Sequence, residues 1–136
     1  MAKSFEVKII ESSMELTHKE RVMLKDTSRA IKLDEVCENG NEIQIKPTGY
    51  ARLSIHNEKA DNPDYEQILV IDESGKKYIT GSSSFWRSFI DIWTEMTDYT
   101  LKEGEVRTES EEWSLIIYKK DSKNYKGKQF LTCSIA

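Results

Sequence analysis

The sequence predicts a mostly β fold of the α+β class, and three observations support this. Apolar and polar residues alternate in several short segments, which is typical of strands with one buried face. Turn-forming residues separate these segments, and one stretch, 84–97, carries apolar residues at helical spacing. The length of 136 residues suits one domain, in which we expect 1–41 to be an N-terminal extension and 42–136 the main body.

The sequence of the N-terminal extension predicts a strand followed by a short helix. Apolar and polar residues alternate in 4–10, which indicates a strand. A short helix is expected at about 15–25, with Leu16, Met23 and Leu24 on its buried side. The stretch 26–41 fits both helical and strand spacing. We interpret it as a connector with a possible helical turn.

One long strand, bent at Gly49, is expected next. Alternation runs through 42–45 and resumes in 50–56 in the same phase. Glycine permits the sharp bend or bulge that such an interruption requires. The odd-numbered residues would face the core, which leaves Tyr50 and Arg52 on the other face.

A hairpin and a helix follow. Residues 66–71 and 76–80 read as strands joined by a turn over 72–75. The glycine and serines of 81–84 then provide an N-cap for the amphipathic helix predicted over 84–97.

The C-terminal part is expected to contain an acidic loop and two further strands. Residues 98–112 are rich in acids and lack periodicity, which is typical of a solvated loop. The segments 112–120 and 128–135 alternate as strands do, and the connection between them is rich in lysine.

The order bent strand, strand, strand, helix, strand, strand is that of an OB-fold, a five-stranded Greek-key barrel with a helix after its third strand. The alternative is a general α+β domain in which an antiparallel sheet carries the amphipathic helix on one face. OB-folds bind oligonucleotides across their second and third strands and the loops between strands 1 and 2 and between strands 4 and 5. The lysine-rich connection corresponds to the latter loop, whereas the former, 56–64, is acidic apart from Lys59.

Charge is distributed unevenly along the chain. Residues 113–136 hold five lysines and one aspartate, whereas 1–112 hold 15 basic and 23 acidic residues. A local basic surface with aromatic rings suits single-stranded nucleic acid, because lysines neutralise phosphates and bases stack on aromatic rings. The predicted nucleic-acid-binding residues are Tyr50, Arg52, Tyr78, Tyr118, Lys119, Lys120, Lys123, Tyr125, Lys126, Lys128 and Phe130.

Each of these residues also has a structural interpretation. The alternative for Tyr125 is an anchor of the turn, and for the lysines it is solvated side chains that protect edge strands from aggregation. The alternative for Tyr50 and Arg52 is cross-strand pairing on an outer sheet face. Phe130 alternates out of phase with the predicted core positions of the last strand, and its alternative is packing under the N-terminal extension.

Two segments, from Tyr78 to Phe89 and from Ser122 to Cys133, resemble parts of small proteins encoded by bacteriophages and related mobile elements. The functional class implied is the phage single-stranded-DNA-binding protein of OB-fold type, over about 42–136. The resemblance implies a barrel that coats single strands in replication or recombination within the bacterial host cytoplasm. Bacterial members of the class usually end in an acidic tail that recruits partners, whereas this chain ends in the strand-like 130–136.

Catalysis and cofactor binding find little support in the sequence. His18 and His56 have no metal-ligand spacing with each other or with Cys37 and Cys133. Nucleophile-elbow, phosphate-loop and dinucleotide motifs are absent. We expect no enzyme, no metal and no cofactor, two free thiols in a reducing cytoplasm, and no membrane association, since no apolar run approaches the length of a membrane span.

The hypothesis is therefore a non-catalytic protein that binds single-stranded DNA. The alternative is an acidic protein-interaction module, for instance a phage-encoded inhibitor of a host protein, and an oligomer-forming accessory protein is a third possibility. The sequence leaves open the oligomeric state, the preference between DNA and RNA, the identity of a replication or recombination partner, and the roles of 1–41 and 98–112.

Overall fold

The computed structural model describes residues 4–97 and 112–136. Its elements, in chain order, are β1 (Phe5–Ser12), α1 (His18–Lys25), β2 (Ile31–Lys32), α2 (Leu33–Val36), the 3-10 helix η1 (Glu38–Gly40), β3 (Ile43–Ile45), β4 (Pro47–Asn57), β5 (Asp64–Asp72), β6 (Lys77–Thr80), α3 (Ser83–Thr97), β7 (Leu115–Asp121) and β8 (Gln129–Ile135). The protein is mostly β with helices, as predicted. The helix between the third and fourth strands of the main body and the strand and helix of the extension are also confirmed.

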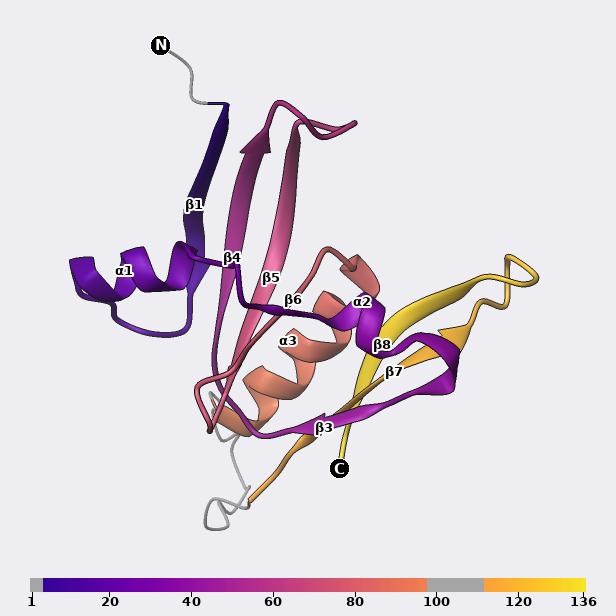
Figure 1. The fold of residues 1–136 in the computed structure, drawn as a ribbon. Coiled ribbons are helices and arrows are strands. Elements are labelled where there is room, and N and C mark those ends of the chain that lie inside the picture. The colour runs from indigo at the N-terminus through magenta and orange to yellow at the C-terminus, as the bar shows by residue number, and fades with distance from the viewer. Residues whose placement is uncertain (1–3, 98–111) are drawn as a thin grey trace, which may run out of the picture.

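The strands form two sheets (Figure 1). One, sheet A, has the order β1-β4-β5-β6-β2, and the other, sheet B, has the order β3-β7-β8. Within the described residues the two sheets do not close into a barrel, because β6 pairs with β2 and not with β8. The acidic loop predicted over 98–112 lies outside the described residues, apart from Glu112.

The predicted bent strand is divided between the two sheets. β3 pairs with β7 in sheet B, and β4 pairs with β1 and β5 in sheet A. The pairing of β4 with β5 shifts register between Pro47 and Gly49. At Gly49 a β-carbon would lie 2.6 Å from the Met14 sulfur, so the absence of a side chain lets the extension cross the strand closely.

The prediction that the odd-numbered residues keep one core face through the bend is wrong. Ile45 packs in the main core, between the sheets and α3, together with Tyr50, whereas Ala51 and Leu53 pack in a second core on the opposite face of sheet A. A bulge inserts an extra residue and reverses which residues face which side. Around Tyr50 and Ala51, β4 therefore carries buried residues on both of its faces.

Helix α3 fills the space between the sheets. It begins where the Ser82 hydroxyl accepts a hydrogen bond from the Phe85 amide at 3.2 Å, which is the predicted N-cap. Its Phe85 and Phe89 side chains are fully buried. On the side toward β8, the Ser84 hydroxyl donates to the Leu131 carbonyl at 2.7 Å, so α3 covers the edge of β8 that pairs with no strand among the described residues.

The extension is part of the fold and not an appendage. Strand β1 lengthens sheet A beside β4, and Leu24 of α1 is buried in the second core. A capping box between Thr17 and Glu20 starts α1. At the other end of α1 the Lys77 ammonium of β6 donates to backbone carbonyls of the helix terminus, at Met23 and Asp26.

We predict that Phe89→Ala lowers the free energy of unfolding by about 3–5 kcal/mol, because it removes a large side chain from a site without solvent access. Urea denaturation followed by circular dichroism would measure this. Phe130→Ala, which truncates an exposed ring on β8, is the matched control and should change stability by less than about 0.5 kcal/mol. Equal losses for the two variants would contradict the assignment of the core.

Candidate nucleic-acid interface

The candidate interface is built on the hairpin of β7 and β8. Cross-strand neighbours in an antiparallel pair lie on the same face of the sheet. Ile117 pairs with Cys133 and Leu115 with Ile135, and Leu115, Ile117 and Cys133 belong to the main core. The alternate positions therefore form the opposite, outer face of the hairpin.

That outer face presents Tyr118, Lys120 and Phe130. Lys120 pairs directly with Phe130, and Tyr118 is the next outward residue along β7. The Tyr118 hydroxyl is hydrogen-bonded to the Ser134 hydroxyl at 2.7 Å, which holds the ring of Tyr118 across the hairpin. Phe130 is 38% exposed, so the predicted outward position of this ring is confirmed.

The loop of the hairpin has a defined turn. The Ser122 amide donates to the Lys128 carbonyl at 2.8 Å, and the Lys128 amide donates to the Tyr125 carbonyl at 3.1 Å. Gly127 lies at φ +82°, a conformation suited to the third position of a type II turn. The turn leaves Tyr125 66% exposed, with the Lys128 ammonium 6.0 Å from the centre of its ring.

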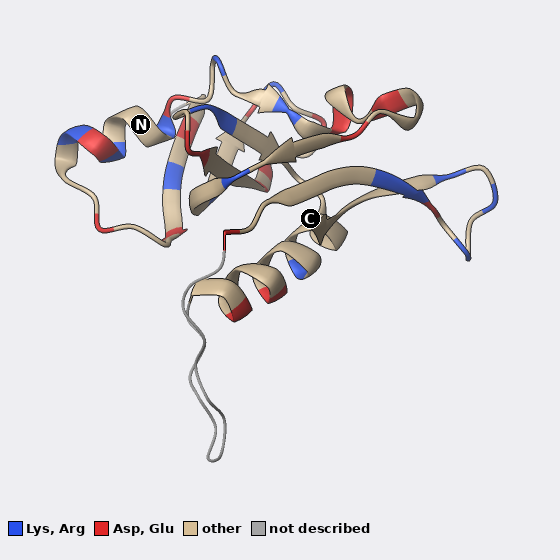
Figure 2. Ribbon diagram, turned by 90° about the horizontal axis from the view of Figure 1, so that it is seen from below, with Lys and Arg blue, Asp and Glu red and all other residues tan. Residues whose placement is uncertain are grey.

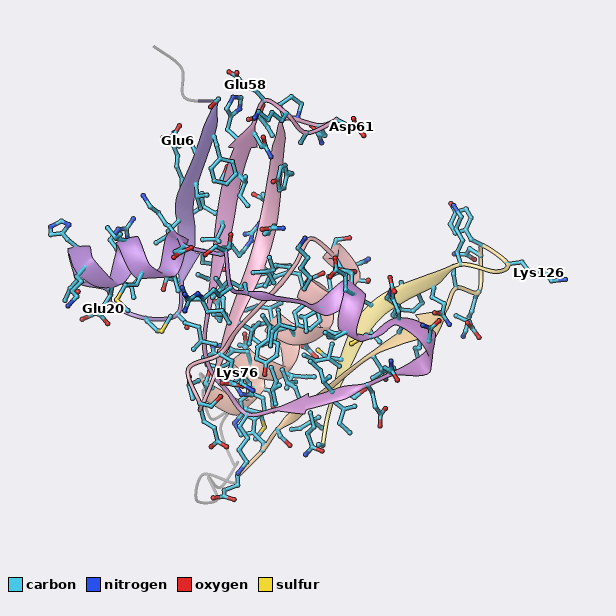
Figure 3. All side chains as sticks on the ribbon, in the orientation of Figure 1. Glu6, Glu20, Glu58, Asp61, Lys76 and Lys126 are labelled. Atoms are coloured by element: carbon cyan, nitrogen blue, oxygen red, sulfur yellow. The ribbon has the colours of Figure 1, made fainter. Side chains whose placement is uncertain are left out.

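Positive charge gathers at the tip of this hairpin (Figure 2). Lys126 projects from the tip into solvent (Figure 3), and Lys120, Lys123 and Lys128 are also exposed. None of these lysines forms a salt bridge with another residue in the described ranges. The nearby carboxylate, Asp121, accepts a hydrogen bond from the Gln129 amide at 3.0 Å. The lysines thus keep their charge available for an external anion.

Lys119 is on the hairpin but faces inward. It pairs with Leu131 of the core, on the same side as the Cys37 thiol. Burial raises the pKa of Cys37, and the positive charge of Lys119 opposes that increase. Lys119 is therefore separated from the outer face that Lys120 occupies.

The predicted outward position of Tyr50 is wrong. Tyr50 is 9% exposed, and its ring contacts those of Trp86, Phe89 and Trp93 edge-on at centroid distances of 5.5, 5.6 and 5.5 Å. The bulge at the start of β4, between Pro47 and Gly49, turns this residue toward α3, so it offers no face to a base.

Arg52 lies on sheet A, away from the hairpin, and is held by its neighbours. Its guanidinium donates to Glu66 at 2.9 Å and lies 5.1 Å from the centre of the Trp86 ring. Glu66 belongs to the adjacent strand β5, where it lies directly opposite Ser54 and diagonally from Arg52. A phosphate would have to displace Glu66.

Tyr78 is also buried, at 7% exposure, and belongs to the main core, so its ring is not exposed for the base stacking expected from the sequence. Its hydroxyl donates to Asp72 at 2.8 Å. Burial, the hydrogen bond and the charge of Asp72 raise the pKa of Tyr78 to about 12. The same carboxylate accepts from the Ser74 amide and hydroxyl and from the Lys76 amide, so Asp72 links Tyr78 of β6 to the β5–β6 turn.

The surface that an OB-fold would use on its second and third strands is covered. The side of β5 and β6 that faces away from the main core carries Leu69 and Ile79, which pack with Leu24 of α1 and with Met14 and Leu16 of the preceding segment. The β4–β5 loop with Asp61 points in another direction from the hairpin tip (Figure 3). The extension thus leaves the β7–β8 hairpin as the exposed basic and aromatic surface.

Thr132 and Ser134 were not predicted from the sequence, and they support the hairpin without belonging to its exposed surface. They share the even-numbered positions of β8 with Phe130, so the alternation that singled out Phe130 also indicated them. Thr132 is buried where its hydroxyl meets that of Ser88 on α3 at 3.0 Å. Ser134 positions Tyr118.

The described residues offer little for other chemistry. No group of three or more histidine, cysteine, aspartate and glutamate side chains among them is placed to hold a metal ion. Cys37 and Cys133 are free and buried, and burial raises the pKa of Cys133 to about 12, which keeps it a thiol at neutral pH. Within the described ranges, no helix has both the length and the apolar character needed to cross a membrane.

Comparison of the chain with protein-family models, with curated proteins and with solved structures found no match. The structure therefore supplies the observations from which a function can be proposed. Of the eleven predicted residues, it brings together seven on the outer face and loop of one hairpin: Tyr118, Lys120, Lys123, Tyr125, Lys126, Lys128 and Phe130.

We predict that Tyr78→Phe lowers the free energy of unfolding by about 1 kcal/mol near neutral pH, because Asp72 loses a hydrogen-bond donor. Burial pushes the pKa of Asp72 upward, but its hydrogen bonds outweigh burial and lower it. A carboxylate with a lowered pKa stabilises the fold above its unfolded pKa of about 4 and loses that effect in acid. The difference between variant and wild type should therefore shrink as pH falls below about 4, as urea titrations at several pH values would measure.

Proposed function

We propose that the protein is a non-catalytic single-stranded-DNA-binding protein whose binding surface is the β7–β8 hairpin. The observation that carries the proposal is the exposure of Tyr125 and Phe130 beside lysines that have no described carboxylate partner. Phosphates would neutralise Lys120, Lys123 and Lys126, and unpaired bases would stack on the rings. Duplex DNA buries its base faces and would offer only its phosphates.

The strand pairing supports a relation to the OB-fold. The bent strand of that fold pairs with its second and fourth strands, and here β4 pairs with β5 while β3 pairs with β7. We propose an opened OB-like arrangement in which α3 occupies the gap between β6 and β8. The hairpin then corresponds to the loop between strands 4 and 5, which contributes to oligonucleotide binding in OB-folds.

The resemblance noted in the sequence extends this proposal to a setting. It suggests action in phage replication or recombination in the cytoplasm of a bacterial host, alongside a replication or recombination protein. The net charge of −4 gives no general attraction to DNA, so binding must depend on the local basic hairpin.

We predict that wild-type protein binds a labelled single-stranded 30-mer (oligo-dT) more tightly than the matching duplex, as fluorescence anisotropy would measure. Changing Lys123, Lys126 and Lys128 together to Ala should weaken binding. The plot of log affinity against log salt should become flatter by about 2, since each lost phosphate contact removes about 0.7 from its slope.

A matched control changes Lys19, Lys32 and Lys59 to Ala. These lysines are exposed elsewhere on the surface, and their removal alters the net charge by the same amount. The control should keep the wild-type affinity and salt slope. If the hairpin and control variants bind alike, the hairpin is not the DNA-binding surface.

We further predict that Tyr125→Ala and Phe130→Ala each weaken binding by about 1–3 kcal/mol, the range for loss of one stacked base, with little change in salt dependence. Tyr78→Phe, which alters a buried tyrosine, is the control and should leave the affinity unchanged. Retention of full affinity by both alanine variants would exclude stacking at this hairpin.

A further inference from the structure

Strand β1 has an edge without a partner strand. It lies at the end of sheet A and pairs only with β4 among the described residues. Unpaired edges are open to association with another strand. Figure 1 shows this edge facing away from the rest of the sheet, with α1 extending past it.

The backbone direction along β1 identifies the groups that are free. The Ser4 carbonyl accepts a hydrogen bond from the Glu58 amide at 3.0 Å, so the backbone of Ser4 is directed toward the β4 side. The backbone N–H and C=O groups of successive residues point alternately to the two sides of a strand. The backbone groups of Glu6 and Lys8 therefore also point toward β4. The amides and carbonyls of Phe5, Val7 and Ile9 point to the open edge, before the bulge between Ile9 and Glu11.

A second copy of β1 matches this edge in one antiparallel register. If Val7 pairs with the partner's Val7, the outward backbone groups of Phe5 and Val7 meet those of the partner's Ile9 and the partner's Val7. The same register places Glu6 opposite the partner's Lys8, and Lys8 opposite the partner's Glu6. These are positions without backbone hydrogen bonds, where side chains approach most closely, so the opposite charges meet where they interact best.

The side of the edge toward α1 carries both apolar and charged side chains. Phe5 is 54% exposed, and Val22 and Met23 of α1 are also exposed. A groove of about 370 Å³ is lined by Phe5, Val7 and Val22 and by the charged residues Glu6, Lys8, Lys25 and Asp26. In the register centred on Val7, the partner's strand would enter this groove and cover these side chains.

We propose that the protein forms a symmetric homodimer through antiparallel pairing of β1 with the partner's β1, which joins the two copies of sheet A into one continuous sheet. The two-fold axis passes midway between Val7 and the partner's Val7. The dimer places both hairpins at its periphery, and its formation does not depend on DNA binding.

The experiment is a charge exchange measured by sedimentation equilibrium over about 1–100 µM protein, since dimer formation depends on concentration. Wild type should be dimeric in the upper part of this range. Glu6→Lys alone and Lys8→Glu alone should be monomeric, because each places like charges opposite each other twice. The double variant Glu6→Lys/Lys8→Glu should regain the dimer, since it restores both opposite-charge pairs.

Lys76→Glu is the matched control for Lys8→Glu. It changes the net charge equally at the β5–β6 turn (Figure 3) and should remain dimeric. Circular dichroism of each variant would verify the fold. Amide hydrogen exchange gives a second measurement, in which the Val7 amide should exchange at least tenfold more slowly in wild type than in folded Lys8→Glu.

Three results would overturn the proposal. They are a monomeric wild type throughout the concentration range, a dimer that survives both single charge changes, and a double variant that is folded but stays monomeric. A rapidly exchanging Val7 amide in the dimer would have the same consequence, because association would then use another surface.

Discussion

The packing of the Tyr50 ring against Trp86, Phe89 and Trp93 is the interaction on which the rest of the structure depends. It joins β4 of sheet A to α3, while α3 in turn covers β8 of sheet B. Edge-on aromatic contacts bury large apolar surfaces in a defined geometry. Among the described residues no strand pairing joins the two sheets, so this helix and its rings hold the β7–β8 hairpin in place relative to sheet A.

The N-terminal extension imposes the second constraint. By placing Leu24, Met14 and Leu16 on the outer side of sheet A, it gives the sheet two buried faces. A ligand then has no access to the face of β5 and β6, and surface chemistry is confined to edges and loops. The β7–β8 hairpin and the open edge of β1 are the two such places with a distinctive composition, one basic and aromatic, the other apolar with alternating charge.

The spacing of apolar and polar residues along the sequence was informative where one face of a helix or strand is buried and the other is solvated. It predicted β8 and the outward position of Phe130, the N-cap and extent of α3, and the lysine-rich connection, because each follows from residue spacing alone. It failed at Tyr50 and Tyr78, which lie in a sheet covered on both sides. In such a sheet, tyrosines at the positions that alternate with the apolar residues are buried too. The Tyr78 hydroxyl donates its hydrogen bond to Asp72 inside the protein. Residue spacing also could not show that the barrel stays open. A strand of only two residues, β2, pairs with the edge of β6 that would otherwise be available to β8.

The sequence by itself determined the element order, the bend near Gly49, the acidic body and the basic, aromatic hairpin loop, since all of these are properties of neighbouring residues. Only the tertiary structure decided which tyrosines reach solvent, which face of the hairpin Lys119 and Lys120 occupy, and which strand edge stays open. Those outcomes depend on contacts between segments far apart in the chain. A bulge of one residue is enough to reverse the side toward which each side chain points.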